Sequence, residues 1–277
     1  MTDDCCQPTD ASTDTSTDTP TAREQRNAVR DRYGSIATES ETLGGDCCEG
    51  DADTPETAEK LGYSADDIEA VAEGANLSLG CGNPTAIAEL SEGETVVDLG
   101  SGGGFDCFLA AREVGESGRV VGVDMTPEMV ERARDNTETN DADNVEFRLG
   151  EIEHLPMADG QADVIISNCV VNLSPDKPQV FAEAYRVLEP GGRIAITDVV
   201  LTAEIPTELR GDLDALSSCI SGAARIEELE AMLDDAGFEA VEIEPKEDSE
   251  EFIREWTEDR DLSEYVVSAR ITARKPA

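Results

Sequence analysis

The stretch Thr95-Val96-Val97-Asp98-Leu99-Gly100-Ser101-Gly102-Gly103-Gly104 decides the fold of this chain. Its apolar first half predicts a buried strand, and its glycines predict a loop whose backbone can approach a ligand closely. The apolar run 107–111 predicts a helix, so the loop lies at a helix N-terminus with free N–H groups. A second predicted strand, 119–123, ends at Asp124, 24 residues (124 − 100) after Gly100, where a carboxylate can accept ribose hydroxyls. Together these features predict a nucleoside-binding β–α–β unit.

The loop reads D-x-G-x-G-x-G, which favours S-adenosylmethionine over a dinucleotide. Asp98 stands where the ammonium of a free amino acid would lie, whereas the same charge would repel a pyrophosphate. An ordinary glycine-rich turn is a weaker interpretation, because strand, loop, helix, strand and acid follow in the right order. The loop resembles the first motif of class I S-adenosylmethionine-dependent methyltransferases. That resemblance implies an α/β, Rossmann-like fold and assigns adenine contacts to Glu151 and the backbone of Ile152.

The candidate cofactor-binding residues lie in the glycine loop and at the ends of the predicted strands. They are Asp98, Gly100, Gly102, Gly104, Asp124, Met125, Glu151, Ile152 and Asn168.

A strong excess of negative charge limits the classes of partner. The chain of 277 residues has 63 acidic and 21 basic residues and a formal net charge of −42. Such a surface repels nucleic acid and anionic membranes, so neither is expected as a partner. It also repels itself in dilute buffer, which predicts a halophilic protein that works in concentrated salt. With no apolar run of 18 residues and no signal sequence, we expect a cytoplasmic protein whose eight cysteines are thiols.

The chain divides into four predicted parts. Residues 1–20 are expected to be a disordered tail, and 21–90 a helical, cysteine-bearing cap whose first helix ends near Gly34. Residues 91–200 form the S-adenosylmethionine-binding core, and 201–277 contain a rim insertion, 202–224, and the closing part of the sheet. Further strands are predicted at 144–149, 162–169, 193–198, 238–244 and 265–274. This pattern predicts a seven-stranded, mostly parallel sheet with an antiparallel last strand.

Three cysteines fall where the predicted fold places the mouth of the cofactor site. Cys169 follows the fourth strand, at the carboxyl edge where ligands bind in open α/β sheets. Cys219 lies in the rim insertion, and Cys81 is flanked by two glycines in the cap. Three thiolates on separate segments can form a trigonal site for a soft ligand, but small buried hydrophobic residues fit the pattern equally well. The residues alone leave both interpretations open.

Several stretches are similar to the arsenite methyltransferase family over about residues 24–245. They are 79–82, 98–107, 123–126, Ser-Asn-Cys-Val-Val-Asn-Leu-Ser-Pro-Asp-Lys at 167–177, and 183–188. The resemblance implies that Cys81, Cys169 and Cys219 bind trivalent arsenic, presented as a thiol conjugate of arsenite, for methylation and detoxification. It also implies a disulfide relay through a further cysteine and reduction by thioredoxin or a small thiol. The adjacent pair Cys47 and Cys48 leaves the identity of the relay thiol open.

Other functions share parts of this pattern. A C- or O-methyltransferase acting on an organic metabolite such as a quinone would share the whole cofactor domain. A metalloid-binding protein without turnover would share the cysteines, and a nicotinamide oxidoreductase is disfavoured by Asp98. Because one fold hosts many activities, the geometry of the site must decide among them.

Overall fold

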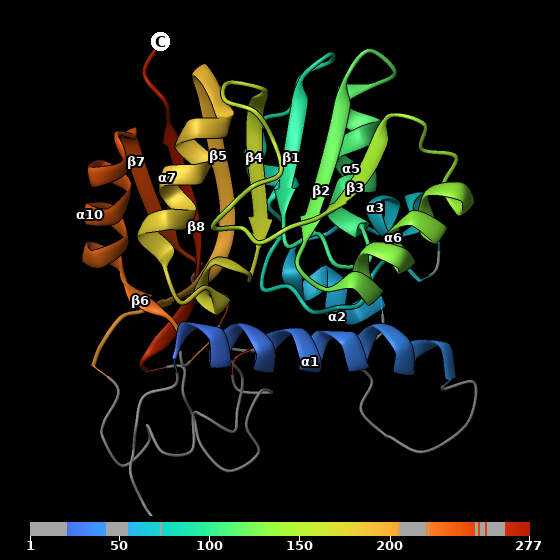
Figure 1. Cartoon of the computed structure of the whole chain (residues 1–277), viewed down its shortest axis with the longest axis horizontal. Helices are drawn as coiled ribbons and strands as arrows, with labels where there is room; N and C mark the ends of the chain where they lie inside the picture. The colour runs from blue at the N-terminus through green and yellow to red at the C-terminus, as the bar shows by residue number, and fades with distance from the viewer. Residues whose placement is uncertain are drawn as a thin grey trace, which may run out of the picture.

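Seven strands of the computed structural model form one twisted sheet in the order β3-β2-β1-β4-β5-β8-β7 (Figure 1). The structure describes residues 21–42, 55–72, 74–204, 222–246 and 264–277, with the single positions 220, 249 and 253. The strands are β1 (Thr95–Leu99), β2 (Arg119–Asp124), β3 (Val145–Leu149), β4 (Ala162–Asn168), β5 (Leu188–Leu201), β7 (Glu239–Pro245) and β8 (Val266–Arg274). A two-residue strand, β6 (Ala224–Arg225), pairs with the end of β5.

The predicted topology is confirmed. Strands β3, β2, β1, β4 and β5 run parallel, whereas β8 is antiparallel to both of its neighbours, β5 and β7. The register pairs Asp98 of β1 with Gly122 of β2, and Leu99 with Ser167 of β4. The carboxyl ends of β1, β2 and β4 therefore meet at one edge of the sheet, where the glycine loop begins.

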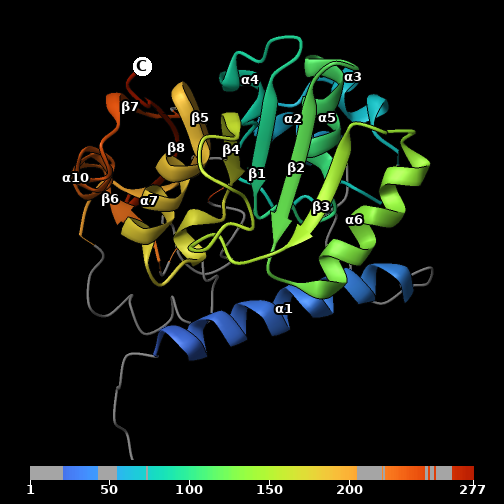
Figure 2. The same ribbon diagram turned by 45° about the horizontal axis from the view of Figure 1, so that its top comes forward.

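Helices cover both faces of the sheet (Figures 1 and 2). The helices are α1 (Ala22–Thr42), α2 (Pro55–Leu61), α3 (Ala65–Ala70), α4 (Thr85–Ala88), α5 (Phe105–Val114), α6 (Pro127–Thr139), the 3₁₀ turn η1 (Val171–Leu173), α7 (Lys177–Val187) and α10 (Ile226–Ala236). Helix α3 begins with a capping box, in which Ser64 and Asp67 exchange hydrogen bonds of 3.1 and 2.8 Å with each other's backbone N–H groups.

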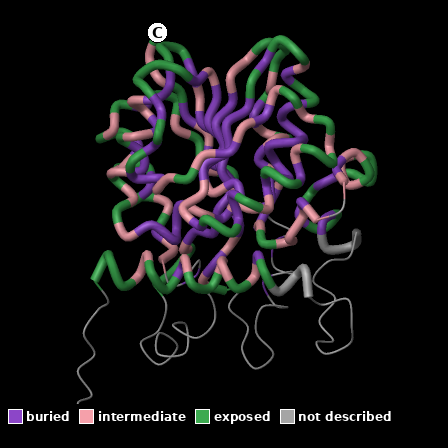
Figure 3. Tube along the Cα trace, turned by 45° about the vertical axis from the view of Figure 1, so that its right-hand side comes forward, coloured by how far each residue is buried: buried purple, intermediate pink, exposed green. Residues whose placement is uncertain are grey.

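The buried core lies on the two sides of the central strands (Figure 3). Val97 and Leu99 of β1 pack with α7 and α10 on one face, and Val96 packs with α5 and α6 on the other. Successive side chains of a strand point to opposite faces, so an apolar run without alternation is what a sheet covered on both faces requires. This core fixes the strand ends that carry the candidate site.

Helix α1 lies across the sheet edge formed by the carboxyl ends of the parallel strands (Figures 1 and 2). The predicted end of this helix at Gly34 is wrong, because the helix continues to Thr42. Gly34 has no positive φ, so it does not act as a helix stop. The later turns are anchored instead by tertiary contacts, such as the bond of 3.1 Å from Arg132 Nη1 to the Ala37 carbonyl.

Several predictions fall wholly or largely outside the described residues. They concern the tail 1–20, Cys47 and Cys48, Cys219, and most of the insertion 202–224. Among the residues that the structure describes, no helix is both long and apolar enough to cross a membrane.

Candidate active site

The glycine loop joins β1 to α5 and forms one wall of a cavity. Gly100 and Ser101 donate backbone hydrogen bonds of 2.7 and 3.1 Å to the Val123 carbonyl, which fixes the loop against β2. Gly100 has φ of 72°, and a Cβ at this position would overlap Val170. Gly102 faces open space, and its N–H donates a hydrogen bond of 3.0 Å to Asp124 Oδ2. The predicted loop therefore has its backbone turned toward the cavity and Asp124 tied to it.

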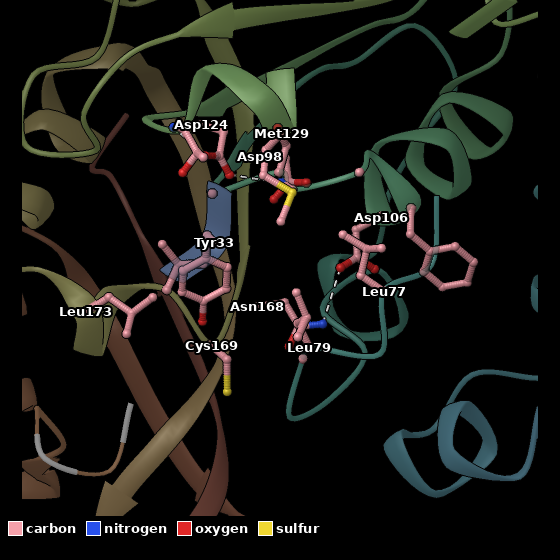
Figure 4. A pocket seen from close by; sticks show the side chains of 18 of the residues that line it. Tyr33, Leu77, Leu79, Asp98, Asp106, Asp124, Met129, Asn168, Cys169 and Leu173 are labelled. Carbon is pink, nitrogen blue, oxygen red and sulfur yellow. Dashed lines mark hydrogen bonds between the residues drawn. The ribbon is translucent and has the colours of Figure 1, made fainter. Parts of the chain in front are cut away.

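The cavity is partly open to solvent and extends from the glycine loop to the ends of β2 and β4. Figure 4 shows its labelled side chains, with Asn168 and Cys169 on the opposite side from Asp124 in that view. It is lined by residues of α1, the segment 75–80, the glycine loop and the ends of β2 and β4. Of the predicted cofactor residues it includes Asp98, Gly100, Gly102, Asp124, Met125, Ile152 and Asn168.

Three aspartates line the cavity, Asp98 and Asp106 buried and Asp124 half-buried, and their charges fit a cationic ligand. Burial and the negative charges of Asp106 and Asp124 raise the pKa of Asp98 well above its ordinary value. Burial raises the pKa of Asp106 to about 6, against hydrogen bonds from Tyr63 and Asn168 that lower it. Burial also raises the pKa of Asp124, opposed by the N–H groups of Thr126 and Gly102. Ionised carboxylates this close are destabilising without a cation, and S-adenosylmethionine carries one on its ammonium and one on its sulfonium.

The two acidic residues in the turn after β3 differ in their position relative to the cavity. Ile152 lines the cavity, but Glu151 is not among the lining residues. The Glu151 carboxylate lies 3.7 Å from Arg26 and 3.6 Å from Arg30 of α1. Glu153 is the acidic residue of this turn that does line the cavity, and it accepts a bond of 2.7 Å from Ser174. The adenine contact assigned to Glu151 stays a prediction.

Gly104 closes the loop as the residue before α5. Its φ of 95° suits glycine, and a Cβ there would lie 2.7 Å from the Phe147 ring. It is therefore required for loop shape and close packing, and the structure does not place it among the residues that line the cavity.

Two of the predicted arsenic ligands are brought together. Cys81 and Cys169, 88 residues apart in sequence, are joined by a disulfide with a Cα–Cα distance of 5.8 Å. The expectation that all cysteines are thiols is thus wrong for this pair, because folding places the two side chains within bonding reach. Among the described residues, Cys107 is the free cysteine. It is buried in α5, and its thiol donates to Asp98 over 3.2 Å.

The amide of Asn168 holds the Cys81 loop in place. Asn168 Oδ1 accepts the backbone N–H of Cys81 at 3.0 Å, and Asn168 Nδ2 donates to the Gly82 carbonyl at 2.8 Å. A Cβ at Gly80 would overlap this amide, and one at Gly82 would lie 2.8 Å from Thr197 Cβ. The glycines that flank Cys81 therefore permit the close approach of the loop. Asn168, predicted to bind cofactor, lines the cavity but directs its amide to the chain itself.

Sequence reasoning missed a carboxylate beside the cysteine pair. Asp198 of β5 is buried, and one of its oxygens and both sulfurs lie within 4.8 Å of one another. Its carboxylate accepts hydrogen bonds from the side chain of Asn172 and from the backbone of Asn172 and Val199, at 2.8 to 3.1 Å. Burial raises the pKa of Asp198 to about 6. The available signal was its position near the carboxyl edge of the sheet, which it shares with Asp98 and Asp124.

Comparison with known proteins shows which protein families this chain resembles. The model of a methyltransferase domain family matches residues 90–237. The arsenite methyltransferase of Halobacterium salinarum is 58% identical over 264 residues, which cover 92% of this chain and 67% of that protein. The chain belongs to the arsenite methyltransferase family.

More distant members of the family agree with this assignment. Human arsenite methyltransferase is 40% identical over 168 residues, covering 57% of this chain and 44% of that protein. The crystal structure of an arsenic(III) S-adenosylmethionine methyltransferase from Chlamydomonas reinhardtii has a TM-score of 0.58 and 33% identity, covering 80% of this chain and 74% of that one. The family membership confirms the class I fold and S-adenosylmethionine as the cofactor. The roles of individual residues stay predictions.

Proposed function

We propose that this protein transfers a methyl group from S-adenosylmethionine to trivalent arsenic held by cysteine sulfurs. The observation that carries the proposal is the placement of Cys81 beside Cys169, which itself lines the cavity of the glycine loop. Cys219, outside the described residues, is proposed as the third sulfur ligand. Thiolates are natural ligands for a soft, small ion with trigonal geometry.

The chemistry needs positioning more than proton transfer. In the reduced protein each cysteine replaces one substituent of an arsenite–thiol conjugate, and the cysteine proton leaves with the displaced thiol. S-adenosylmethionine supplies an electrophilic methyl group on a positively charged sulfur. The lone pair of arsenic forms the new As–C bond as the S–CH₃ bond breaks, and the residues of the cavity align the two atoms and exclude water.

The disulfide between Cys81 and Cys169 fits the end of such a cycle. Methylation formally oxidises arsenic from the trivalent to the pentavalent state. Two cysteine thiols can return the two electrons, which regenerates trivalent arsenic and leaves one disulfide. An external dithiol such as thioredoxin, or a small thiol, then restores the cysteines. Since this recovery needs a reducing compartment, we place the reaction in the cytoplasm.

Arsenic speciation tests the activity. The reduced protein is incubated with arsenite, S-adenosylmethionine and glutathione, and the arsenic species are separated and identified. Methylated arsenic supports the proposal. Arsenite binding without product would indicate a sequestering protein instead. No arsenite binding would favour an organic acceptor.

The ligand set is tested by X-ray absorption on arsenite-loaded, reduced protein. We expect three As–S bonds in the wild type and fewer in Cys81→Ser, Cys169→Ser or Cys219→Ser. Because ligands of one site act as a unit, double variants should be scarcely less active than single ones. Cys107→Ser is the matched control and should keep three As–S bonds. Three As–S bonds and full turnover in Cys219→Ser would move the third ligand to Cys47 or Cys48.

A further inference from the structure

Asp106 is a buried carboxylate in the cavity wall to which the proposed function gives no role. It lies in the first turn of α5, directly after the glycine loop, and is 8% exposed. Its Oδ1 accepts a hydrogen bond of 2.7 Å from the Tyr63 hydroxyl, and its Oδ2 accepts one of 3.2 Å from Asn168 Nδ2. Both of these donors are uncharged, so neither neutralises an ionised carboxylate in this buried position.

The same contacts connect Asp106 to the cysteine pair. Asn168 Nδ2, which donates to Asp106, also lies 3.0 Å from the Tyr63 hydroxyl and 2.8 Å from the Gly82 carbonyl. The other end of the Asn168 amide accepts the N–H of Cys81, and Cys169 is the next residue along the chain. Figure 4 shows the bond between Asp106 and Asn168, with Cys169 on the other side of Asn168 from Asp106 in that view. One short network therefore runs from Asp106 through Asn168 to the backbone of Cys81, and Asn168 is bonded directly to Cys169 along the chain.

The other three carboxylates of the cavity already have partners or assignments. Glu153 is paired with Arg26 at 3.6 Å and accepts the Ser174 hydroxyl, so its charge is compensated within the protein. The two remaining aspartates are assigned to different parts of the donor. Asp124 stands at the end of β2, where ribose hydroxyls are bound in this fold, and Asp98 was assigned to the ammonium. The sulfonium must lie nearer to the cysteines, because its methyl group has to reach an atom that they hold. Asp106 is the carboxylate whose contacts lead to that end of the cavity.

We propose that Asp106 is the charge partner of the donor's sulfonium and that, through Asn168, it couples occupation of the donor site to the position of Cys81 and Cys169. The part of this inference that concerns coupling to the cysteines rests on the proposed function. A cation beside Asp106 draws the carboxylate toward the cavity. That movement alters its bond to Asn168 and hence the contact of Asn168 with the Cys81 loop.

The proposed charge role of Asp106 predicts that the protein binds S-adenosylmethionine, whose sulfur is positively charged, more tightly than a product whose sulfur is uncharged. S-adenosylmethionine and S-adenosylhomocysteine differ by the methyl group and the positive charge on sulfur. Calorimetric titration of Asp106→Asn should show about tenfold weaker binding of the donor, with the affinity for the product changed less than about twofold. Asp135→Asn, an exposed change on α6, is the matched control and should leave both affinities unchanged. An equal loss for both ligands would overturn the charge role.

A second variant separates charge from structure. Tyr63→Phe removes the hydroxyl that binds Asp106 but keeps the carboxylate. It should therefore preserve the preference for S-adenosylmethionine, even if Asp106→Asn does not fold. If Tyr63→Phe loses that preference, Asp106 serves only to anchor Tyr63, and the inference is wrong.

The coupling half is measured at the cysteines, without arsenic. Reduced protein is alkylated with iodoacetamide, and the modification rates of Cys81 and Cys169 are followed by mass spectrometry. S-adenosylmethionine should change these rates at least threefold in the wild type, and S-adenosylhomocysteine should not. The donor effect should vanish in Asp106→Asn at saturating donor. A donor effect that persists there would contradict the coupling. Since neither assay contains arsenic, failure of the proposed function would be seen in the speciation experiment and not here.

Discussion

Asp124 binds the loop that it helps to form. Its two carboxylate oxygens accept the N–H groups of Gly102 and Thr126 at 3.0 and 2.8 Å. The side chain is therefore a structural tie between the ends of β1 and β2 as well as the predicted acceptor of the ribose hydroxyls. Both roles place it at the same point of the cavity.

Replacing Asp124 by Ala should weaken S-adenosylmethionine binding. Loss of hydrogen bonds to a charged acceptor costs about 1.5–3 kcal/mol, roughly a ten- to hundredfold change in affinity. Isothermal titration measures the change, and Asp135→Ala serves as an exposed control. Unchanged affinity would remove Asp124 from the cofactor site.

Asp198 gives the protein a pH dependence whose sign follows from its raised pKa of about 6. Between the ordinary pKa of 3.8 and about 6, the folded state binds more protons at this group than the unfolded state. The contribution of Asp198 to stability therefore falls as the pH rises through that range, by up to about 3 kcal/mol.

The matching experiment compares wild type with Asp198→Asn by chemical denaturation at pH 4, 5, 6 and 7. The amide loses an acceptor for Asn172, which costs stability equally at every pH. On top of this constant cost, the free energy of unfolding of the variant should improve relative to wild type as the pH rises. A difference that does not vary with pH would show that Asp198 titrates normally.

Some residues of the site could be predicted because their roles depend on local sequence. Asp98, Gly100, Gly102 and Asp124 follow strands at fixed spacing, and the parallel register brings them together. Asp106, Asp198 and Tyr63 were missed because their roles depend on contacts between segments that lie far apart in sequence. Tyr63, for example, contacts a residue 43 positions away and another 105 positions away. The disulfide was missed for the same reason.

At the level of elements, the sheet could be predicted and the helix α1 only in part. Parallel strands that are buried on both faces appear in the sequence as short, continuous apolar runs, which are a specific signal. A helix that lies on a surface has weaker signals, and here a glycine within it suggested an end that the structure does not have. The polar face of α1 is held by ion pairs from Arg26 and Arg30 to Glu151, which no local pattern reveals.

Gly34→Ala should stabilise α1. Glycine inside a helix costs about 0.5–1 kcal/mol relative to alanine, and the added Cβ would lie 3.4 Å from Glu128 Oε2, an ordinary contact. Thermal unfolding should show a higher midpoint. A lower midpoint would mean that Glu128 cannot yield to the methyl group.

At the scale of the whole molecule, net charge dominates the response to salt. Ion pairs such as Arg193 with Glu94, at 2.8 Å, are weakened by salt, but 63 acidic residues face only 21 basic ones. Screening of the mutual repulsion should therefore outweigh the loss of individual pairs.

The unfolding midpoint should rise steadily from dilute buffer to molar KCl. Sucrose at matched osmotic strength is the control, because it stabilises compact states without screening charge. A midpoint that falls or stays flat in KCl would contradict a halophilic protein.

The bond between Cys81 and Cys169 also changes the topology of the chain. It closes a covalent ring whose two cysteines are 88 positions apart and which contains β1, β2, β3 and β4, so the oxidised chain remains a lariat when it unfolds. Closing a loop of this size removes conformational entropy from the unfolded ensemble worth roughly 4–5 kcal/mol. Reduction of the disulfide, which the proposed reaction requires, removes this constraint on the unfolded chain and therefore lowers the stability of the folded protein. An arsenic atom bridging the same two sulfurs would close the ring again, so the substrate would act as a temporary cross-link that restores the stability lost on activation.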